Sequence, residues 1–382
     1  MKFTIGRAAF TAQLIDVSRA IPSKATIPIL TGIKITATKE GITLIGSDAE
    51  ISIESFLSVQ DDSLGLEIEE TGSIVVTARI FNDIVRKLPT TKVTIETNEQ
   101  FILTATSGEA IFSLNGTDGQ SYPRLPEIES DRKINLPTVL FKELISQTIF
   151  SASNQESRPV LTGVHLMMNE GHITGVATDS HRLSRRQIPV EFTTDQANFE
   201  AITIPKKTLN ELERIVQDDQ TIEMIVTEQQ VIFLIENLTI YSRLLEGNYP
   251  DTDRLLPSSH TTEIVLNADQ FLHAIDRASL MSHQGKNNVV QLDITDDNID
   301  LSVQGSSLGS ANESISAKSI TGEPIKISFN PDYMKDALRS FSGVDINVGF
   351  TSSVRPLLIS ALEKSETPNN ELLQLLTPIR TH

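Results

Sequence analysis

Apolar residues recur along the chain in one alternation of short strands and amphipathic helices, and this alternation appears three times. Each copy opens with an alternating strand, followed by apolar positions three and four residues apart that share one helical face. The opening strands and helices occupy residues 2–5 with 7–20, 133–136 with 137–149, and 263–266 with 267–281. Such repetition indicates tandem copies of one unit.

The rest of each copy also keeps a fixed order. A hairpin-like stretch comes next, at residues 29–35 with 42–48, 160–166 with 173–179, and 289–294 with 299–303. A strand then runs directly into a second helix, at residues 74–77 with 79–88, 201–204 with 205–216, and 325–328 with 331–341, and closing strands begin at residues 92, 221 and 345. Pro205 and Pro331 suit a first helical turn, and Asn267 and Asn330 suit N-caps.

Two linker-like turns divide the copies, at residues 121–126 and 248–257. We therefore expect three domains of the α+β class, covering residues 1–128, 129–257 and 258–382. In each unit two helices would pack on antiparallel sheets. Because an unpaired sheet edge is a liability, we expect neighbouring units to join edge to edge.

Composition excludes several classes of protein. With 382 residues, 39% of them hydrophobic and 21% charged, the chain has enough apolar material to fold. It has no cysteine, which excludes disulfides, thiolate metal sites and a cysteine nucleophile. The first residues lack the apolar core of a signal peptide, and no apolar run reaches the length of a membrane span. We expect a cytoplasmic protein.

The charge is sorted by element. The net charge is −18, yet the six predicted helices hold 12 Lys and Arg against 9 Asp and Glu, so the rest of the chain carries about −21. The helical basic residues include Arg79, Arg86, Lys87, Lys206, Lys207 and Arg339. If the helices share one wall, that wall would attract a polyanion.

Simple geometry limits how such a wall could close. Six helices, each about 10 Å wide, would enclose a hole of roughly 9 Å, whereas twelve would enclose a hole of roughly 28 Å. Only the larger hole admits a DNA duplex. A ring of helices around DNA would therefore need two chains.

The whole chain resembles the bacterial DNA polymerase III β subunits, the sliding clamps. The resemblance covers all three copies and rests on Met1–Ile5, Thr26–Leu30, Ala177–Leu183, Tyr249–Asp251 and Thr377–Arg380. It implies a head-to-tail dimeric ring with helices inside and acidic sheets outside. It also implies a non-catalytic clamp that encircles duplex DNA without cofactor or metal. Its implied partners are the polymerase III catalytic subunit, the clamp loader and other proteins with a clamp-binding motif.

The resemblance also implies three sets of site residues. The partner-peptide pocket would comprise Leu161, Thr178, Ser180, His181, Arg182, Leu183, Pro250, Arg254, Leu255, Val354, Leu375, Leu376, Thr377, Pro378, Ile379 and Arg380. The DNA-facing set would comprise Lys24, Arg79, Arg86, Gln155, Arg158 and Lys207. The dimer contact would comprise Phe112, Leu114, Leu280 and Met281, residue types that more often belong to a core.

The pocket has a chemical rationale in the residues themselves. Its leucines and prolines would form an apolar slot, with His181 and Arg182 as donors at the rim. The second copy carries His181, Arg182, Arg185 and Arg186 where the first has Glu50 and Glu54, and this divergence indicates specialisation. Two departures from the family are Ser180, where members often carry Gly, and the Thr381–His382 end, where members often have a more apolar tail.

Two other classes of function remain as alternatives. One is a hydrolase that uses Asp179 and His181, with or without a metal, although neighbours on an extended strand point to opposite faces and cannot easily form a relay. His165 and His172 show no metal-ligand spacing with a third ligand. The other is a repeat scaffold that binds peptides without DNA. No Walker loop or dinucleotide fingerprint is present, so loading onto DNA would need another protein.

Overall fold

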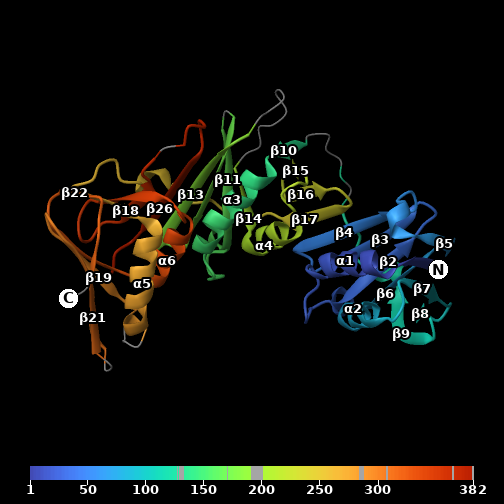
Figure 1. Cartoon of the computed structure of the whole chain (residues 1–382). Coiled ribbons are helices and arrows are strands. Elements are labelled where there is room, and N and C mark those ends of the chain that lie inside the picture. The colour runs from blue at the N-terminus through green and yellow to red at the C-terminus, as the bar shows by residue number, and fades with distance from the viewer. Residues whose placement is uncertain are drawn as a thin grey trace. The chain divides into compact units, whose positions relative to one another are not determined.

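The computed structural model describes residues 1–126, 128, 133–169, 171–190, 201–283, 288–306, 309–363 and 365–380. The chain divides into two compact units (Figure 1). Unit 1 comprises Met1–Thr138 and Arg214–Leu244, and unit 2 comprises Val139–Glu213 and Leu245–His382. The middle copy of the repeat is therefore shared between the two units.

All six predicted helices are confirmed. They are α1 (Arg7–Ser18), α2 (Ala78–Lys87), α3 (Thr138–Thr148), α4 (Lys206–Ile215), α5 (Ala268–Ser282) and α6 (Pro331–Arg339). The N-caps are also confirmed, since Asn267 accepts a hydrogen bond from the Gln270 N–H and Asn330 accepts one from the Asp332 N–H. Pro205 does not begin a helix as predicted; it ends the preceding strand, one residue before α4.

Unit 1 contains one antiparallel sheet of 13 strands. In spatial order the strands are β10 (Ile134–Leu136), β15 (Ile222–Val226), β16 (Gln230–Ile235), β17 (Leu238–Arg243), β4 (Ile51–Ser58), β3 (Gly41–Ser47), β2 (Gly32–Ala37), β6 (Gly72–Thr77), β9 (Ala110–Asp118), β8 (Ile102–Ser107), β7 (Lys92–Thr97), β1 (Lys2–Gly6) and β5 (Glu67–Glu70). The acidic strand β5 forms one end of this sheet.

Unit 2 contains two antiparallel sheets. The nine-stranded sheet has the order β14 (Ile202–Pro205), β11 (Gly163–Asn169), β12 (His172–Thr178), β13 (Arg182–Pro189), β26 (Glu371–Leu376), β25 (Leu357–Ala361), β24 (Asp345–Phe350), β18 (Thr262–Asn267) and β22 (Ser319–Gly322). The four-stranded sheet has the order β21 (Gly309–Ile315), β20 (Ile299–Ser306), β19 (Val290–Ile294) and β23 (Ile325–Phe329).

The copies join edge to edge, as expected from their free sheet edges. We call the pairing of β17 with β4 in unit 1 the first seam, with Ile240 opposite Ile53 near its middle. We call the pairing of β13 with β26 in unit 2 the second seam, with Ser184 opposite Gln374. Each seam joins the last strand of one copy to a strand of the preceding copy, so each sheet continues across a copy boundary.

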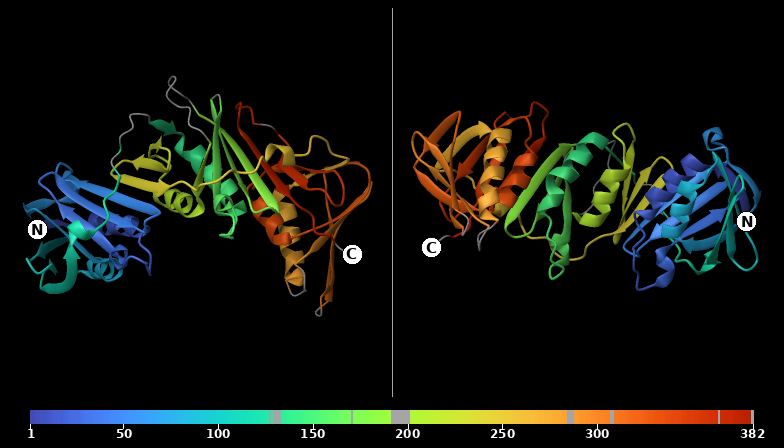
Figure 2. Two further views of the ribbon diagram at one scale, coloured as in Figure 1. Left: turned by 180° about the vertical axis from the view of Figure 1, so that it is seen from behind. Right: turned by 60° about the horizontal axis from the view of Figure 1, so that its bottom comes forward.

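The helices pack onto the sheets through phenylalanines at equivalent positions. Phe10, Phe141 and Phe271 each stand in the first turns of the opening helix of a copy, and all three are fully buried. In unit 1 the Phe10 ring meets Phe3 edge-on at 5.9 Å and Phe81 at 6.1 Å between ring centres. These contacts hold α1 and α2 together against the sheet of unit 1. Figure 2 shows the helices lying against the strands of the sheets.

The hairpin-like stretches begin later than the sequence predicts. In the first two copies the residues before the first strand of the hairpin form 3₁₀ turns, η1 (Pro28–Thr31) and η5 (Pro159–Thr162), each with proline at its start. Glycine then opens the strand, because the backbones cross closely there. A Cβ at Gly163 would lie 2.2 Å from the carbonyl oxygen of Ile204.

Candidate functional site

The turn between β12 and β13 lies at the start of the second seam. The Asp179 carboxylate oxygen Oδ1 accepts hydrogen bonds from the backbone N–H of His181 at 2.9 Å and of Arg182 at 3.0 Å. Ser180, at the tip, has a positive φ of 75°. The sequence interpretation that residues 179–181 lie on an extended strand is therefore wrong, because the aspartate side chain folds them into a tight turn.

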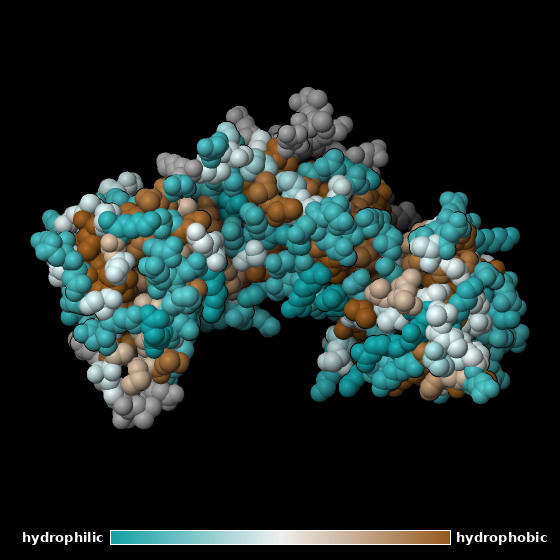
Figure 3. Space-filling view, in the orientation of Figure 1, coloured by the Kyte–Doolittle hydropathy of each residue, from teal (hydrophilic) through white to brown (hydrophobic). Residues whose placement is uncertain are grey.

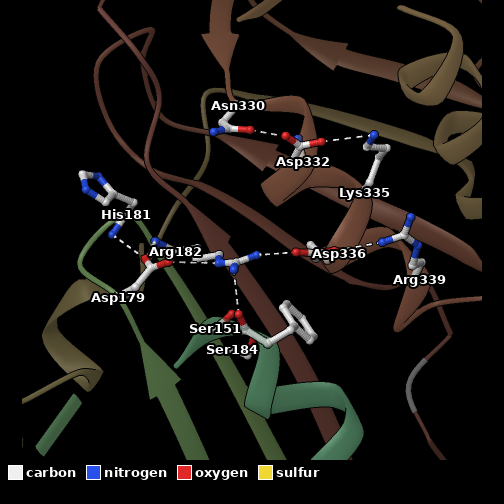
Figure 4. Close-up of polar contacts among 12 residues, drawn as sticks. Ser151, Asp179, His181, Arg182, Ser184, Asn330, Asp332, Lys335, Asp336 and Arg339 are labelled. Atoms are coloured by element: carbon white, nitrogen blue, oxygen red, sulfur yellow. Dashed lines mark hydrogen bonds and ion pairs between the residues drawn. The ribbon is translucent and has the colours of Figure 1, made fainter. Parts of the chain in front are cut away.

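Arg182 is the hub of the polar contacts behind this turn (Figure 4). Its Nε donates to Asp179 Oδ2 at 3.1 Å, its Nη1 to Asp336 Oδ2 on α6 at 2.7 Å, and its Nη2 to the carbonyl of Phe150 at 2.6 Å. Only 12% of the side chain is exposed. The planar guanidinium thus joins the turn between β12 and β13, the 3₁₀ turn after α3 (Ile149–Ser151) and helix α6.

Aromatic rings surround the same guanidinium. Its central carbon lies 4.4 Å from the centre of the Tyr333 ring and 5.5 Å from that of Phe150. The His181 ring stacks on the Tyr333 ring, with 6.4 Å between the ring centres. Burial, with a further contribution from Arg182, lowers the pKa of Lys206 at the start of α4. The region therefore concentrates positive charge against two carboxylates.

An apolar floor lies next to the turn. Val176, Leu183 and Leu375 form a buried cluster, and partly buried side chains pack against it: Met167, Tyr249, Leu256 and Leu358. Tyr249 donates its hydroxyl to the carbonyl of Val176 at 3.4 Å, and its ring stacks on His165 at 4.4 Å. Burial lowers the pKa of His165 to about 4, so the imidazole is neutral at pH 7.

The linker after Tyr249 is anchored over this floor by charge. Asp253 lies 3.6 Å from the Arg185 guanidinium on β13, and Asp251 accepts from Arg254 at 2.8 Å. Leu255 nearby is 49% exposed. Val354, 52% exposed, stands in the turn before β25. Exposed apolar side chains beside a buried apolar floor form a surface that can bind a short apolar peptide motif.

The C-terminal segment is tied to the turn by the backbone. Leu376 lies opposite Arg182 in the second seam, and the Thr377 N–H donates to the carbonyl of His181 at 2.9 Å. Two residues later, the Ile379 N–H donates to the carbonyl of Ser328 at 2.7 Å. The tail therefore crosses from the turn toward β23. Thr381 and His382, the end where the sequence departs from the family, lie outside the described residues.

The structure sorts the predicted peptide residues into a floor and a rim. The buried members are Leu161, Thr178, Leu183, Leu375, Leu376 and Pro378. The exposed members are Ser180, His181, Pro250, Arg254, Leu255, Val354, Thr377 and Arg380, while Ile379 is partly buried. Arg182 is partly buried and three of its nitrogens donate within the chain, while its role as a rim donor stays a prediction.

The predicted DNA-facing residues are exposed in both units. In unit 1, Arg79 and Arg86 line a groove of about 350 Å³ between α1 and α2, together with Arg19, and Lys24 stands exposed after α1. In unit 2, the exposed set is Gln155, Arg158 and Lys207. Lys206, next to Lys207, donates to Asn154 at 3.4 Å and so brings the start of α4 to the 154–158 loop.

The predicted dimer residues are not core residues. On β9, Phe112 is exposed and Leu114 is partly buried; on α5, Leu280 is 68% exposed and Met281 packs against the core of the third copy. Figure 3 shows that hydrophilic residues cover most of the visible face, with hydrophobic residues in separate groups. Phe112 and Leu280 are thus large apolar side chains that the single chain leaves in solvent.

The hydrolase interpretation finds no support at Asp179. Both carboxylate oxygens of Asp179 are engaged by the turn and by Arg182, and the His181 ring lies against Tyr333. Across the described ranges, no group of three or more His, Asp and Glu side chains could hold a metal ion. Of the helices that the structure describes, none is long and apolar enough to cross a membrane.

Sequence reasoning missed the residues that hold the turn from behind. The place of Asp179 in the turn could have been found, since an aspartate whose side chain accepts from the backbone two residues later is a recognised turn signal. Asp336 had no such signal, because it contacts Arg182 across 154 positions of the chain. Phe150 contributes a backbone carbonyl, which sequence cannot assign.

Comparison with known proteins places these features in one family. The chain matches the DNA polymerase III beta subunit in three consecutive parts: its N-terminal domain over residues 1–126, its central domain over residues 135–251 and its C-terminal domain over residues 253–379. It is 45% identical to the beta sliding clamp of Bacillus subtilis and 41% identical to that of Staphylococcus epidermidis, in each case over 100% of both chains.

Solved structures agree with these matches. The chain superposes on the DNA polymerase sliding clamp of Bacillus subtilis with a TM-score of 0.95 and 43% identity, and on the DNA polymerase III beta chain of Streptococcus pneumoniae with a TM-score of 0.94 and 40% identity. Each comparison covers 100% of both chains. The similarity therefore extends over all three copies of the repeat.

Proposed function

Because the chain belongs to the DNA polymerase III beta subunit family, the beta sliding clamps, it is a non-catalytic DNA clamp for polymerase processivity, and we propose that two copies close head to tail into a ring around duplex DNA. The ring would hold DNA by enclosing it rather than by reading its sequence. Its three domains would cover residues 1–128, 129–257 and 258–382, and the protein would act in the cytoplasm.

Among the strands that the structure describes, two edges without a partner strand support the proposed dimer. Along residues 110–115, β9 pairs with β8, and its contact with β6 is confined to residues 116–118. β21 pairs with β20 and ends the four-stranded sheet. Both seams already join copies through such edges, so β9 of one chain pairing with β21 of another would repeat that arrangement. Phe112 and Leu280 would then become buried.

The positive charge on the helices supports the proposed DNA contact. Arg79 and Arg86 are exposed on α2 and Lys207 on α4, while the chain as a whole carries −18. A cationic face on an otherwise acidic protein holds a polyanion without sequence readout. Lys24, Gln155 and Arg158 would add contacts from loops.

The floor and rim of the second seam support the proposed peptide site. Leu183 and Leu375 would bind apolar side chains of a short motif, and Leu255 and Val354 would close over them. The polymerase III catalytic subunit, the clamp loader and other proteins with such a motif would compete for this site. One surface could then serve several DNA-processing proteins in turn.

Retention on DNA of different topology tests the ring. Protein loaded by a clamp loader onto nicked circular DNA should stay bound through a high-salt wash, and cutting the circle once should release it within minutes. The single observation behind this expectation is the pair of unpaired edges on β9 and β21. Equal retention on circular and linear DNA would contradict enclosure.

A further inference from the structure

We propose that Arg182 is a positioning residue of the peptide site, held in place by Asp336 of α6, and that it does not bind the peptide itself. This inference rests on the proposed peptide site at the second seam. It adds Asp336, which lies outside the predicted pocket, to the residues that determine peptide affinity.

The hydrogen bonds of Arg182 are the first argument. A guanidinium has five N–H donors in a fixed plane. Here all three nitrogens donate to groups of the same chain, two of them to different carboxylates, Asp179 and Asp336. With 12% of the side chain exposed and Tyr333 over its face, Arg182 has little surface to offer a ligand.

The second argument is what depends on Arg182. Its Nε holds the carboxylate of Asp179, whose other oxygen shapes the turn by accepting from the His181 and Arg182 N–H groups. The carbonyl of His181 in turn accepts from the Thr377 N–H. The Arg182 side chain therefore holds the turn directly, and the tail depends on it through the backbone bond to His181.

The third argument is that Asp336 itself is held. Its Oδ1 accepts from Arg339 on the next turn of α6 at 2.9 Å, while its Oδ2 accepts from Arg182 at 2.7 Å. Asp336 therefore has a defined orientation between two guanidinium groups, and α6 acts as the rigid base against which Arg182 is set. Removing the carboxylate would free the Nη1 end of Arg182 to turn away from α6.

The positioning role and a direct contact predict opposite results for Asp336→Ala. If Arg182 positions the turn, loss of Asp336 loosens the turn and weakens peptide binding. If Arg182 binds the peptide, loss of Asp336 releases its guanidinium toward the ligand, so affinity stays the same or rises. Arg182→Lys adds a second distinction, because lysine keeps the charge but cannot reach three acceptors in one plane.

The experiment measures the affinity of the full-length dimer for a fluorescein-labelled peptide that carries the binding motif of the polymerase III catalytic subunit, by fluorescence anisotropy. We expect about tenfold weaker binding for Asp336→Ala and a similar loss for Arg182→Lys. In the double variant Arg182→Ala/Asp336→Ala, the affinity should equal that of Arg182→Ala alone, because the two residues act as one.

Asp332→Ala provides the matched control. Asp332 lies on the same helix and also carries ion pairs, to His283 at 3.0 Å and Lys335 at 3.1 Å, but none to Arg182. The Asp332→Ala variant should have an affinity for the peptide within about twofold of wild type. This result would separate the positioning role of Asp336 from a general loss of stability in α6. Wild-type or tighter binding by Asp336→Ala would overturn the inference, whereas absence of binding by the wild-type protein would instead overturn the proposed peptide site.

Discussion

The two seams have the same backbone design and opposite chemistry. In the first, Asp48 accepts from the N–H groups of Glu50 and Ile51 at 2.9 and 2.8 Å, and Ala49 has a φ of 78°. In the second, Asp179 accepts in the same way from the residues two and three positions later, and Ser180 has a φ of 75°. The turn that precedes each seam is thus one structure, repeated.

The side chains that follow the turn differ in charge. Ile51, 1% exposed, stands where the second seam has Arg182. Further along, Ser55 donates to Gln13 of α1 at 2.7 Å, whereas its counterpart Arg186 donates to Glu143 of α3 at 3.0 Å. At these two positions the first copy makes apolar and neutral contacts, and the second copy makes ionic ones.

This difference indicates that the second seam is specialised for more than stability. Buried ion pairs stabilise little compared with apolar residues of the same size, because desolvation offsets the attraction. They do fix geometry, since several hydrogen bonds hold each charged group. A seam that only joined two copies could use the chemistry of the first, so the ionic contacts of the second fit a site whose shape must be maintained.

Exchanging the residue types of Ile51 and Arg182, which occupy equivalent positions in the two seams, should have the largest effect on stability. Ile51→Arg places a guanidinium in an apolar position and should lower the free energy of unfolding by about 3–5 kcal/mol. Arg182→Ile should cost less, about 1–3 kcal/mol, because the carboxylates of Asp179 and Asp336 are 15% and 31% exposed and can regain water. Urea unfolding of both variants measures the difference, and a larger loss for Arg182→Ile would contradict the comparison.

The stability of the sheet that contains the second seam should depend on pH through His165 on β11. Its folded pKa of about 4 lies below the usual value near 6.5, so the unfolded chain takes up a proton first as the pH falls. The stabilisation that neutral His165 contributes is complete above pH 6.5 and is lost between pH 6.5 and 4. By pH 4.5 the free energy of unfolding should have fallen by about 2–3 kcal/mol. The residue at the equivalent position of the first copy is Lys34.

His165→Gln checks this dependence. The variant should lose less stability than wild type when the free energy of unfolding is compared between pH 7 and pH 4.5. Identical losses in the two proteins would show that the stacked imidazole is not responsible. Lys34→Gln, the matching change in the first copy, should leave the loss at the wild-type value.

The linkers beside the two seams also differ, and a substitution in the second linker should have a smaller effect, on peptide binding. The second linker takes nine residues from Tyr249 to Pro257, whereas the first takes five from Tyr122 to Pro126, and the longer one presents Leu255 to solvent. Leu255→Ala should weaken binding of the labelled motif peptide about tenfold, the loss expected for an apolar contact of 1–2 kcal/mol. Leu362→Ala, at an equally exposed leucine in unit 2, is the control and should bind as wild type.

Glycine at the two turn tips should give the smallest effect, and the same effect at both. Ala49 and Ser180 have left-handed backbones that favour glycine. Ala49→Gly and Ser180→Gly should each raise the free energy of unfolding by about 0.5–1 kcal/mol, since relief of strain exceeds the added chain entropy. Thermal unfolding measures both, and stabilisation at only one tip would show that the turns are not equivalent.

Local patterns in the sequence predicted the elements well. Helix positions followed from apolar spacing, and Asn267 and Asn330 marked two helix starts, because caps depend on neighbouring residues. The segments before β2 and β11 were mistaken for strands, since Pro28–Thr31 and Pro159–Thr162 are apolar enough to suggest one but proline begins a 3₁₀ turn instead.

Contacts between distant residues were less predictable. The divergence of Arg182 from its first-copy counterpart indicated a specialised place, but not its role. That role depends on Asp336, whose place beside the turn results from the pairing of β13 with β26. A register between strands so far apart in the sequence arises from the packed fold and leaves no local pattern.

Cysteine cross-linking tests the central claim of a two-chain ring most directly, because the chain has no cysteine of its own. Ile111→Cys on β9 would be combined in turn with Ser310→Cys, Asn312→Cys and Ser314→Cys on β21, which samples the possible registers, and each single variant would serve as a control. After oxidation, at least one pair should give a covalent dimer of two 42.0 kDa chains and no larger species. If every pair of cysteines left only monomers without a cross-link, or gave a ladder of longer oligomers, the closed head-to-tail ring would be contradicted.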